Sequence, residues 1–126
     1  MSHFTRIKVK ITNGDLLKEI LEEMAHAVEE NQLVRGYEGD RTEADFVIRR
    51  PNGYDLGFRR DKDDQNYELI ADFWGARINQ TQFVHEIQRK YAHRQLLETV
   101  AQQGYTIEEQ EILDNGEVRV VVGRWV

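Results

Sequence analysis

The chain contains no cysteine, and this absence excludes several classes of protein. Without thiols there is no disulfide framework, no cysteine nucleophile and no thiolate-ligated zinc or iron–sulfur site. Serine occurs once, at Ser2, which argues against a serine nucleophile. No apolar run approaches the roughly 20 residues of a membrane-spanning helix, and no secretory leader pattern precedes the first strand-like segment. We therefore expect a soluble, cytoplasmic protein.

Proline is also scarce, since Pro51 is the only one among the 126 residues. No Pro-rich, Ser-rich or repetitive stretch indicates a linker or an internal repeat. The length lies close to the modal size of a domain. We therefore expect residues 1–126 to form a single α+β domain.

The charge is negative overall and unevenly distributed. The net charge is −6, which argues against non-specific binding of nucleic acid. However, residues 15–30, 61–72 and 108–117 are acidic, whereas residues 6–10 and 41–60 are basic. A cationic surface among acidic segments suits an acidic protein partner, and it weakens the argument against nucleic acid.

Two segments have the apolar spacing of amphipathic helices. Residues 15–30 carry apolar side chains from Leu17 to Val28 at helical intervals, after an Asn13-Gly14-Asp15 start that provides capping residues. The second segment follows Asn79 and Thr81, either of which can cap a helix, and Gly104 ends it. The sequence therefore predicts helices over about 15–30 and 79–103.

The remaining periodic segments alternate between apolar and other residues, as half-buried strands do. Pro51-Asn52-Gly53 and Asp114-Asn115-Gly116 supply the turns of two hairpins. Residues 31–43 are polar, with a short extended piece expected at 33–37. The predicted strands are 7–11, 44–49, 54–59, 67–74, 105–113 and 117–125.

This order of elements, β-α-β-β-β-α-β-β, predicts the fold class. Successive hairpins make the sheet mostly antiparallel, and two helices with one apolar stripe each cover one of its faces most simply. We therefore expect an α+β two-layer sandwich, loosely ferredoxin-like.

The opposite face of this sheet is the candidate functional surface. Alternation assigns to it basic, aliphatic and aromatic residues together: Arg6, Lys8, Lys10, Val47, Arg49, Gly57, Arg59, Ile70, Asp72 and Trp74. The parity of the last strand is ambiguous, so Trp125 is a further candidate. Three interpretations stay open: an ordinary solvated face, a protein interface (self-association included), or a platform on which RNA bases stack. We single out Arg49, Arg59, Trp74 and Trp125 as partner-binding residues.

The motifs typical of catalytic and metal sites are weak or missing. His85 and His93 lie eight residues apart on the predicted second helix, about 12 Å along its axis, which is too far for one metal ion. The acidic loop that begins at Asp61 has Asn66 and Asp72 where a calcium loop needs Gly and Glu. We therefore predict no catalytic residue, no metal and no cofactor.

Three hypotheses for function follow. The first is a non-enzymatic protein-binding or adaptor domain that acts through the sheet face, and the second is an RNA-binding accessory protein that uses the same face. The third is an enzyme or small-ligand-binding domain with a pocket around Tyr54, Tyr91 and His93.

Several stretches of the chain resemble the family of the hypothetical chloroplast open reading frame thirty-five, found in cyanobacteria and some plastid genomes. The resemblance is carried by Met1-Ser2-His3-Phe4, by Ala44–Arg49, by Pro51–Phe58, by Tyr67–Gly75 and by the closing Arg119–Trp125 strand. It implies the cyanobacterial cytoplasm or the plastid stroma as the compartment. It implies no activity, and it identifies no binding or catalytic residue.

Overall fold

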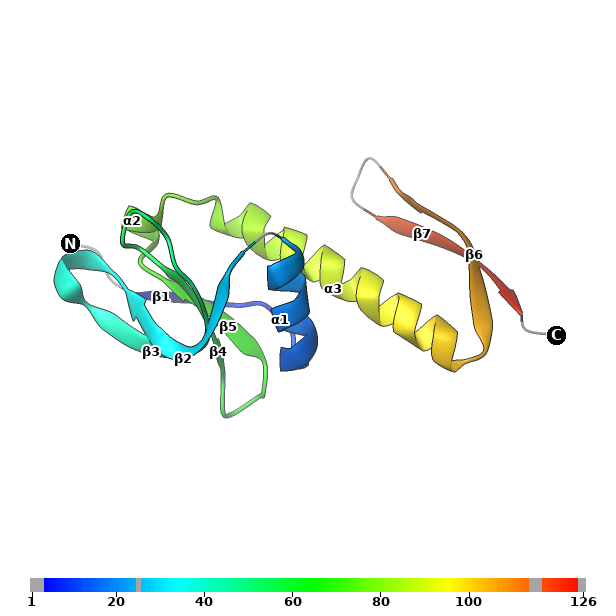
Figure 1. Ribbon diagram of the computed structural model, residues 1–126, viewed down its shortest axis with the longest axis horizontal. Coiled ribbons are helices and arrows are strands. Elements are labelled where there is room, and N and C mark those ends of the chain that lie inside the picture. Colours follow the sequence, from blue (N-terminus) through cyan, green and yellow to red (C-terminus); the bar gives the residue numbers. More distant parts are fainter. Residues whose placement is uncertain (1–3, 25, 114–116, 125–126) are drawn as a thin grey trace. The chain divides into compact units, whose positions relative to one another are not determined.

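The computed structural model describes residues 4–24, 26–113 and 117–124 (Figure 1). The chain divides into two compact units, Met1–Gln88 and Arg89–Val126, which we describe one at a time. The expectation of a single domain stays a prediction. The fold class is confirmed, because helices accompany sheets whose strand pairs are all antiparallel in the described residues.

The first unit contains a five-stranded sheet with the strand order β1-β5-β4-β3-β2. The unit contains few helices. The long helix α3 begins within this unit and continues into the second unit. The elements are β1 (Thr5–Lys8), α1 (Gly14–Glu23), β2 (Val28–Arg35), the 3₁₀ turn η1 (Tyr37–Gly39), β3 (Arg41–Ile48), β4 (Leu56–Arg60), β5 (Tyr67–Ala71), α2 (Phe73–Ala76) and α3 (Gln80–Gln102).

Helix α1 begins where the capping residues predict. The Asn13 side chain accepts a hydrogen bond from the Leu16 N–H at 3.1 Å, which satisfies one of the free donors of the first turn. The apolar stripe of α1 is fully buried and consists of Leu16, Leu17, Ile20 and Leu21. Burial of this stripe holds the helix in place, since an isolated ten-residue helix is marginal in water.

One face of the sheet carries the aromatic part of the core. Phe46 pairs with Phe58 across β3 and β4, and its ring stacks on that of Tyr67 at 5.7 Å. The ring of Phe83, from the first turns of α3, lies 6.3 Å from that of Phe58. The first turns of α3 therefore pack on this face, and the predicted second helix is confirmed by Gln80–Gln102.

The other face of the sheet is buried at its centre, contrary to the prediction that it faces a partner. Val47 and Ile70 were expected to point outward, and they are 0% and 1% exposed. The reason is that Val34, at the end of β2, folds over this face above Gly57. A Cβ on Gly57 would lie 2.3 Å from Val34 Cγ2, so only glycine fits there. Phe4 completes this small second core.

Strand β2 corrects the predicted extent of the first helix. The helix was expected to reach residue 30, but it ends at Glu23 and the chain turns into β2 at Val28. Backbone hydrogen bonding to β3 outweighs the helical spacing of the apolar residues. The register skips Asn31, which has a left-handed φ of 53° and an exposed side chain.

Strand β5 is shorter than the predicted strand 67–74, and this moves Trp74. The strand ends at Ala71, and Phe73–Ala76 form the short helix α2 instead. The prediction that Trp74 lies on the sheet face is therefore wrong. Asp72 also differs from its predicted outward position, because it is 2% exposed.

The second unit comprises the rest of α3 and a hairpin of β6 (Tyr105–Ile112) and β7 (Val118–Arg124). A bulge between Ile107 and Glu109 shifts the register of the hairpin. His93 of α3 bonds through Nε2 to Oε1 of Gln110 at 2.7 Å. The predicted Asp114-Asn115-Gly116 turn lies outside the described residues. Among the helices of the described part, none is both long enough and apolar enough to cross a membrane.

Candidate functional site

The most exposed aromatic ring in the described residues belongs to Trp74, on helix α2. Its side chain is 70% exposed, whereas most large apolar residues of this unit are buried. The Tyr37 ring of η1 meets it edge to face, with centroids 6.2 Å apart and planes at 86°. We call Tyr37 and Trp74 the Trp74 surface. It joins two segments that are far apart in the sequence.

The buried carboxylate of Asp72 fixes these two segments to each other. Its Oδ2 accepts a hydrogen bond from the backbone N–H of Tyr37 at 3.2 Å. Its backbone carbonyl accepts from the N–H groups of Gly75 and Ala76, at 3.2 and 2.9 Å, and so begins α2. A residue that the alternation placed at an outer position therefore organises the Trp74 surface from inside.

The turn before β4 contacts α2 through Asn52 and Tyr54. Asn52 Nδ2 donates to the Gly75 carbonyl at 3.2 Å, and Asn52 Oδ1 accepts from the Tyr54 N–H at 3.0 Å. The Tyr54 ring lies against Gly75, where a Cβ would come within 2.0 Å of it. Any residue larger than glycine at this position would displace the ring or the helix, so the position of Trp74 is set by close packing.

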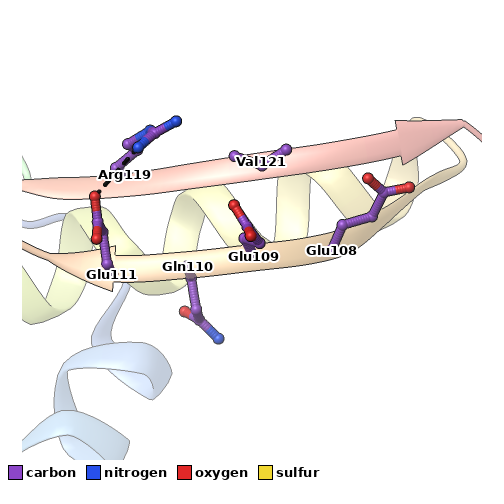
Figure 2. Close-up of a pocket in the computed structure, with 6 residues that line it drawn as sticks. All are labelled: Glu108, Glu109, Gln110, Glu111, Arg119 and Val121. Carbon is purple, nitrogen blue, oxygen red and sulfur yellow. Dashed lines mark hydrogen bonds and ion pairs between the residues drawn. The ribbon is translucent and has the colours of Figure 1, made fainter.

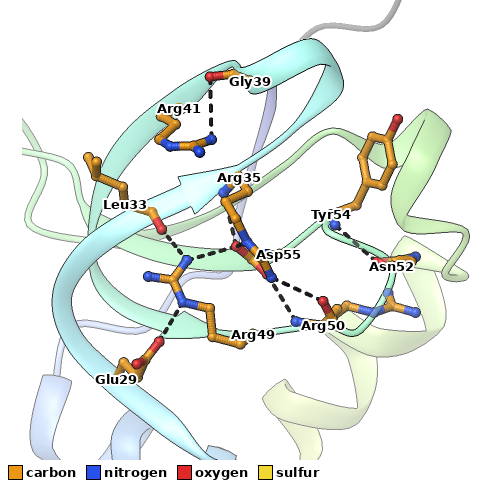
Figure 3. A network of polar contacts seen from close by, with 10 residues as sticks. All are labelled: Glu29, Leu33, Arg35, Gly39, Arg41, Arg49, Arg50, Asn52, Tyr54 and Asp55. Carbon is orange, nitrogen blue, oxygen red and sulfur yellow. Dashed lines mark hydrogen bonds and ion pairs between the residues drawn. The ribbon is translucent and has the colours of Figure 1, made fainter.

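A second polar cluster surrounds Asp55, the residue that precedes β4 (Figure 3). The side chain of Asp55 is completely buried. Arg35 donates to it from Nε at 2.8 Å, from Nη2 at 2.9 Å and from its backbone N–H at 3.0 Å. Arg49 Nη1 and the Arg50 backbone N–H add two more hydrogen bonds, at 2.8 and 2.9 Å. We call Asp55, Arg35, Arg49 and Arg50 the Asp55 cluster.

This cluster shifts the pKa values of its members. Burial by itself raises the pKa of Asp55, but the hydrogen bonds from Arg35, Arg50 and Arg49 outweigh it and hold that pKa far below its usual range. The hydrogen bond to Asp55 also raises the pKa of Arg35. For Arg49, burial lowers the pKa, and the hydrogen bonds to Asp55 and Glu29 reverse the shift and raise it. The Asp55 cluster is therefore ionised at neutral pH, and its hydrogen bonds hold the segments that carry its members together.

The structure distributes the predicted partner-binding residues among different surroundings. Trp74 is exposed, as a contact residue must be. Arg49 is engaged with Asp55, with Glu29 and with the Leu33 carbonyl. Arg59 lies 3.5 Å from the Glu43 carbonyl through Nη1, and Trp125 lies outside the described residues. The described members of the set therefore differ in their contacts, and their role in binding stays a prediction.

The sequence reasoning did not single out Tyr37 or Asp55, and it placed Asp72 on the outer sheet face, whereas its side chain is buried. One signal was available for Asp55, because a carboxylate six residues after Arg49, across a Pro-Asn-Gly turn, returns beside it in a hairpin. For Tyr37 and Asp72 no local pattern carries the information, since their contact spans 35 residues.

Two of the cavities in the described residues have mainly polar linings. One, of about 420 Å³, lies on the hairpin of the second unit (Figure 2) and is lined by Glu108, Glu109, Gln110, Glu111, Arg119 and Val121. The other, of about 400 Å³, lies in the first unit beside the start of α1. There Arg60 lies 4.9 Å over the centre of the Tyr67 ring, and Asp15 and Asp45 also line the cavity.

The residues considered for metal or ligand binding have structural contacts. Tyr54 packs on Gly75, and the Tyr91 hydroxyl accepts a hydrogen bond from Gln95 at 3.2 Å. His93 bonds to Gln110. Across the described ranges, no group of three His, Cys, Asp or Glu side chains is placed to hold a metal ion.

Comparison with known proteins gives a consistent result. A family described as protein of unknown function (DUF1257) matches residues 20–121. The uncharacterized protein ycf35 of Guillardia theta is 32% identical, over 99% of this chain and 98% of its own length. The protein of the same name from Cyanophora paradoxa is 29% identical, over 99% of this chain and 98% of its own length. These matches confirm the resemblance to the chloroplast open reading frame thirty-five family. No solved structure matches the chain.

Proposed function

The chain belongs to the DUF1257 family of proteins of unknown function, and we propose that it is a non-enzymatic protein-binding domain that makes contact through the Trp74 surface. The observation that supports this proposal is a tryptophan that is 70% exposed yet held by packed neighbours. Tryptophan is among the residues most enriched at the centres of protein interfaces.

The fixed position of Trp74 favours binding. An anchor that is already ordered loses little side-chain entropy on association, so more of its burial energy contributes to affinity. The contacts of Asp72 with Tyr37 and of Tyr54 with Gly75 hold the helix that carries Trp74, and the ring itself makes an edge-to-face contact with Tyr37. The partner should offer an apolar pocket deep enough for an indole ring, with an oxygen atom that accepts the indole N–H.

The two alternative functions have less support. An RNA platform needs cations free to meet phosphates beside the stacking ring, but Arg49 is committed to two carboxylates. A small-ligand site needs an enclosed apolar pocket with a few converging polar groups. The cavity on the hairpin of β6 and β7 and the cavity beside the start of α1 are open instead, and both are lined mostly by polar residues.

The compartment belongs to the same proposal. We place the protein in the cytoplasm, or in the plastid stroma if its gene is carried by a plastid. The support is that its relatives bear the name of a hypothetical chloroplast reading frame.

A photo-cross-linking residue at position 37, beside an unmodified Trp74, tests the proposed surface. The full chain carrying it is irradiated in cells of the organism that encodes it, and the cross-linked protein is identified and then purified. Binding of the purified partner to the unmodified chain is measured by calorimetry. We expect Trp74→Ala to weaken this binding by about 2 kcal/mol or more, as loss of a central tryptophan does.

Leu33→Ala is the matched control, because Leu33 is also a large exposed apolar residue, 42% exposed, but lies on β2. It should leave the affinity unchanged. Equal affinity of the Trp74→Ala and unmodified chains would refute the proposal. Capture of RNA in place of protein would favour the second hypothesis.

A further inference from the structure

The hairpin of the second unit is a ribbon of two strands with unpaired edges. In the part of the chain that the structure describes, β6 and β7 pair with each other and with no other strand. A two-stranded ribbon is marginally stable in water, and a free edge is a template for another strand.

The two edges differ in how well they are protected against pairing. Strand β6 carries Glu108, Glu109 and Glu111 together with the bulge, so a second β6 would bring like charges and a distorted backbone against it. Strand β7 has the sequence Val-Arg-Val-Val-Val-Gly-Arg, without a bulge or an acidic residue. The edge of β7 is therefore the one suited to receive a strand.

The hydrogen-bond pattern shows which residues of β7 are available. The Leu113 N–H donates to the Glu117 carbonyl at 2.8 Å, so this is a hydrogen-bonded pair. Pairs alternate along an antiparallel ladder, and the bulge lies on β6 alone. The backbone groups of Val118, Val120 and Val122 therefore point away from β6, toward an incoming strand.

Charge complementarity selects the incoming strand and its register. The Glu108 carboxylate lies over Gly123, where a Cβ would come within 2.1 Å of its Oε1. In an antiparallel pair of β7 strands centred on Val121, the residue opposite Gly123 is Arg119 of the second copy. That guanidinium then meets the Glu108 carboxylate, and the two-fold symmetry forms the same pair again.

We propose that β7 pairs with β7 of a second copy of this chain, around a two-fold axis at Val121, to give a four-stranded antiparallel sheet. Arg119 contacts Glu111 of its own chain at 3.3 Å, with both side chains more than half exposed. Its five N–H donors allow it to hold both carboxylates. A register centred on Val120 would place Arg119 opposite Val121, whose own side chain separates it from Glu109 on β6, whereas Gly123 places no side chain in front of Glu108. The proposal does not depend on the function of the Trp74 surface.

Light scattering of the full chain over a range of concentrations tests the association. We expect a dimer that dissociates on dilution. Arg119→Glu and Glu108→Arg should each weaken dimerisation about tenfold or more, and the double exchange should restore it, because the charges are then reversed together. Arg89→Glu makes the same change of charge at an exposed position of α3, and it should have no effect.

Single cysteines test the register, since the native chain has none. Facing positions on the axis form a pair with Cα atoms about 4.5 Å apart, within the range of a disulfide. Val121→Cys should therefore form a covalent dimer under mild oxidation much faster than Val120→Cys. A chain that is monomeric at every concentration would overturn the proposal. So would a dimer that is insensitive to both charge reversals, or one that cross-links faster through position 120.

Discussion

Arg35 holds Asp55 with a two-pronged contact, from Nε to Oδ2 at 2.8 Å and from Nη2 to Oδ1 at 2.9 Å. This bidentate geometry is the strongest form of arginine–carboxylate pairing. Arg35 ends β2, and Asp55 directly precedes β4. The contact therefore ties the end of an edge strand to a strand with which it shares no ladder.

Asp55→Asn should destabilise the first unit by about 2–3 kcal/mol. Loss of one partner of a fully buried ion pair costs roughly 3–5 kcal/mol, but Arg35 and Arg49 are one-third exposed and recover part of their hydration. Urea unfolding followed by circular dichroism measures the difference. Asp63→Asn, in the exposed loop before β5, is the control and should change stability by less than about 0.5 kcal/mol.

The same variant gives a prediction for pH. The folded-state pKa of Asp55 lies below the unfolded value of about 4, so the stability it contributes is fully present above that pH. It is lost as the pH falls from about 4 through the folded-state pKa. The difference in unfolding free energy between the native chain and Asp55→Asn should therefore be constant from about pH 5 to about pH 7. It should shrink below about pH 4. A difference that grows on acidification would contradict this.

Gly57→Ala should cost about 1–3 kcal/mol, because its Cβ meets Val34 Cγ2 at 2.3 Å and forces the second core apart. Val34→Ala alone should also destabilise, through the loss of buried methyl groups. The combination should cost less than the sum of the two, since the smaller residue at 34 makes room at 57. Strictly additive costs in denaturant unfolding would show that Val34 does not cover Gly57 in solution.

Trp74→Ala should change the unfolding free energy by less than about 1 kcal/mol, because most of the ring is already in water and only the edge contact with Tyr37 is lost. Thermal unfolding measures this. The result matters for the proposed function, since a loss of binding by this variant is then a loss of contact surface. A large drop in stability would instead assign the ring to the core.

Asn13→Ala should destabilise by about 1 kcal/mol, because the first turn of α1 loses the acceptor for the Leu16 N–H. Asn13→Asp keeps the acceptor and should preserve stability. Equal effects of the two substitutions would mean that the cap contributes nothing and that packing alone holds α1.

Sequence patterns predicted the elements that depend on local residue spacing and local capping. The helix over 79–103 and the cap at Asn13 were correct, since helical spacing and capping chemistry are local. Strand β2 was missed because it lies at the sheet edge, exposed along Glu29–Leu33, and so lacks the alternation of a half-buried strand. Its hydrogen bonds to β3 are not visible in its own sequence.

That omission explains the error in the candidate surface. The face of Val47 and Ile70 was expected to be open because the segment that covers it, at Val34, was expected to be a short piece within a polar loop. The alternation extends a strand to Trp74, but β5 ends at Ala71 and the backbone carbonyl of Asp72 accepts the first hydrogen bonds of α2. Contacts between distant segments decide both points, and a single sequence does not contain them.

The left-handed backbone of Asn31 interrupts the β2 edge of the five-stranded sheet. A neighbouring molecule that approached β2 would find the row of backbone donors and acceptors interrupted halfway along the strand. Glu29 and Glu30 lie beside the interruption, so a second β2 would also be repelled. Both features disfavour the pairing of a second β2 with this edge of the sheet.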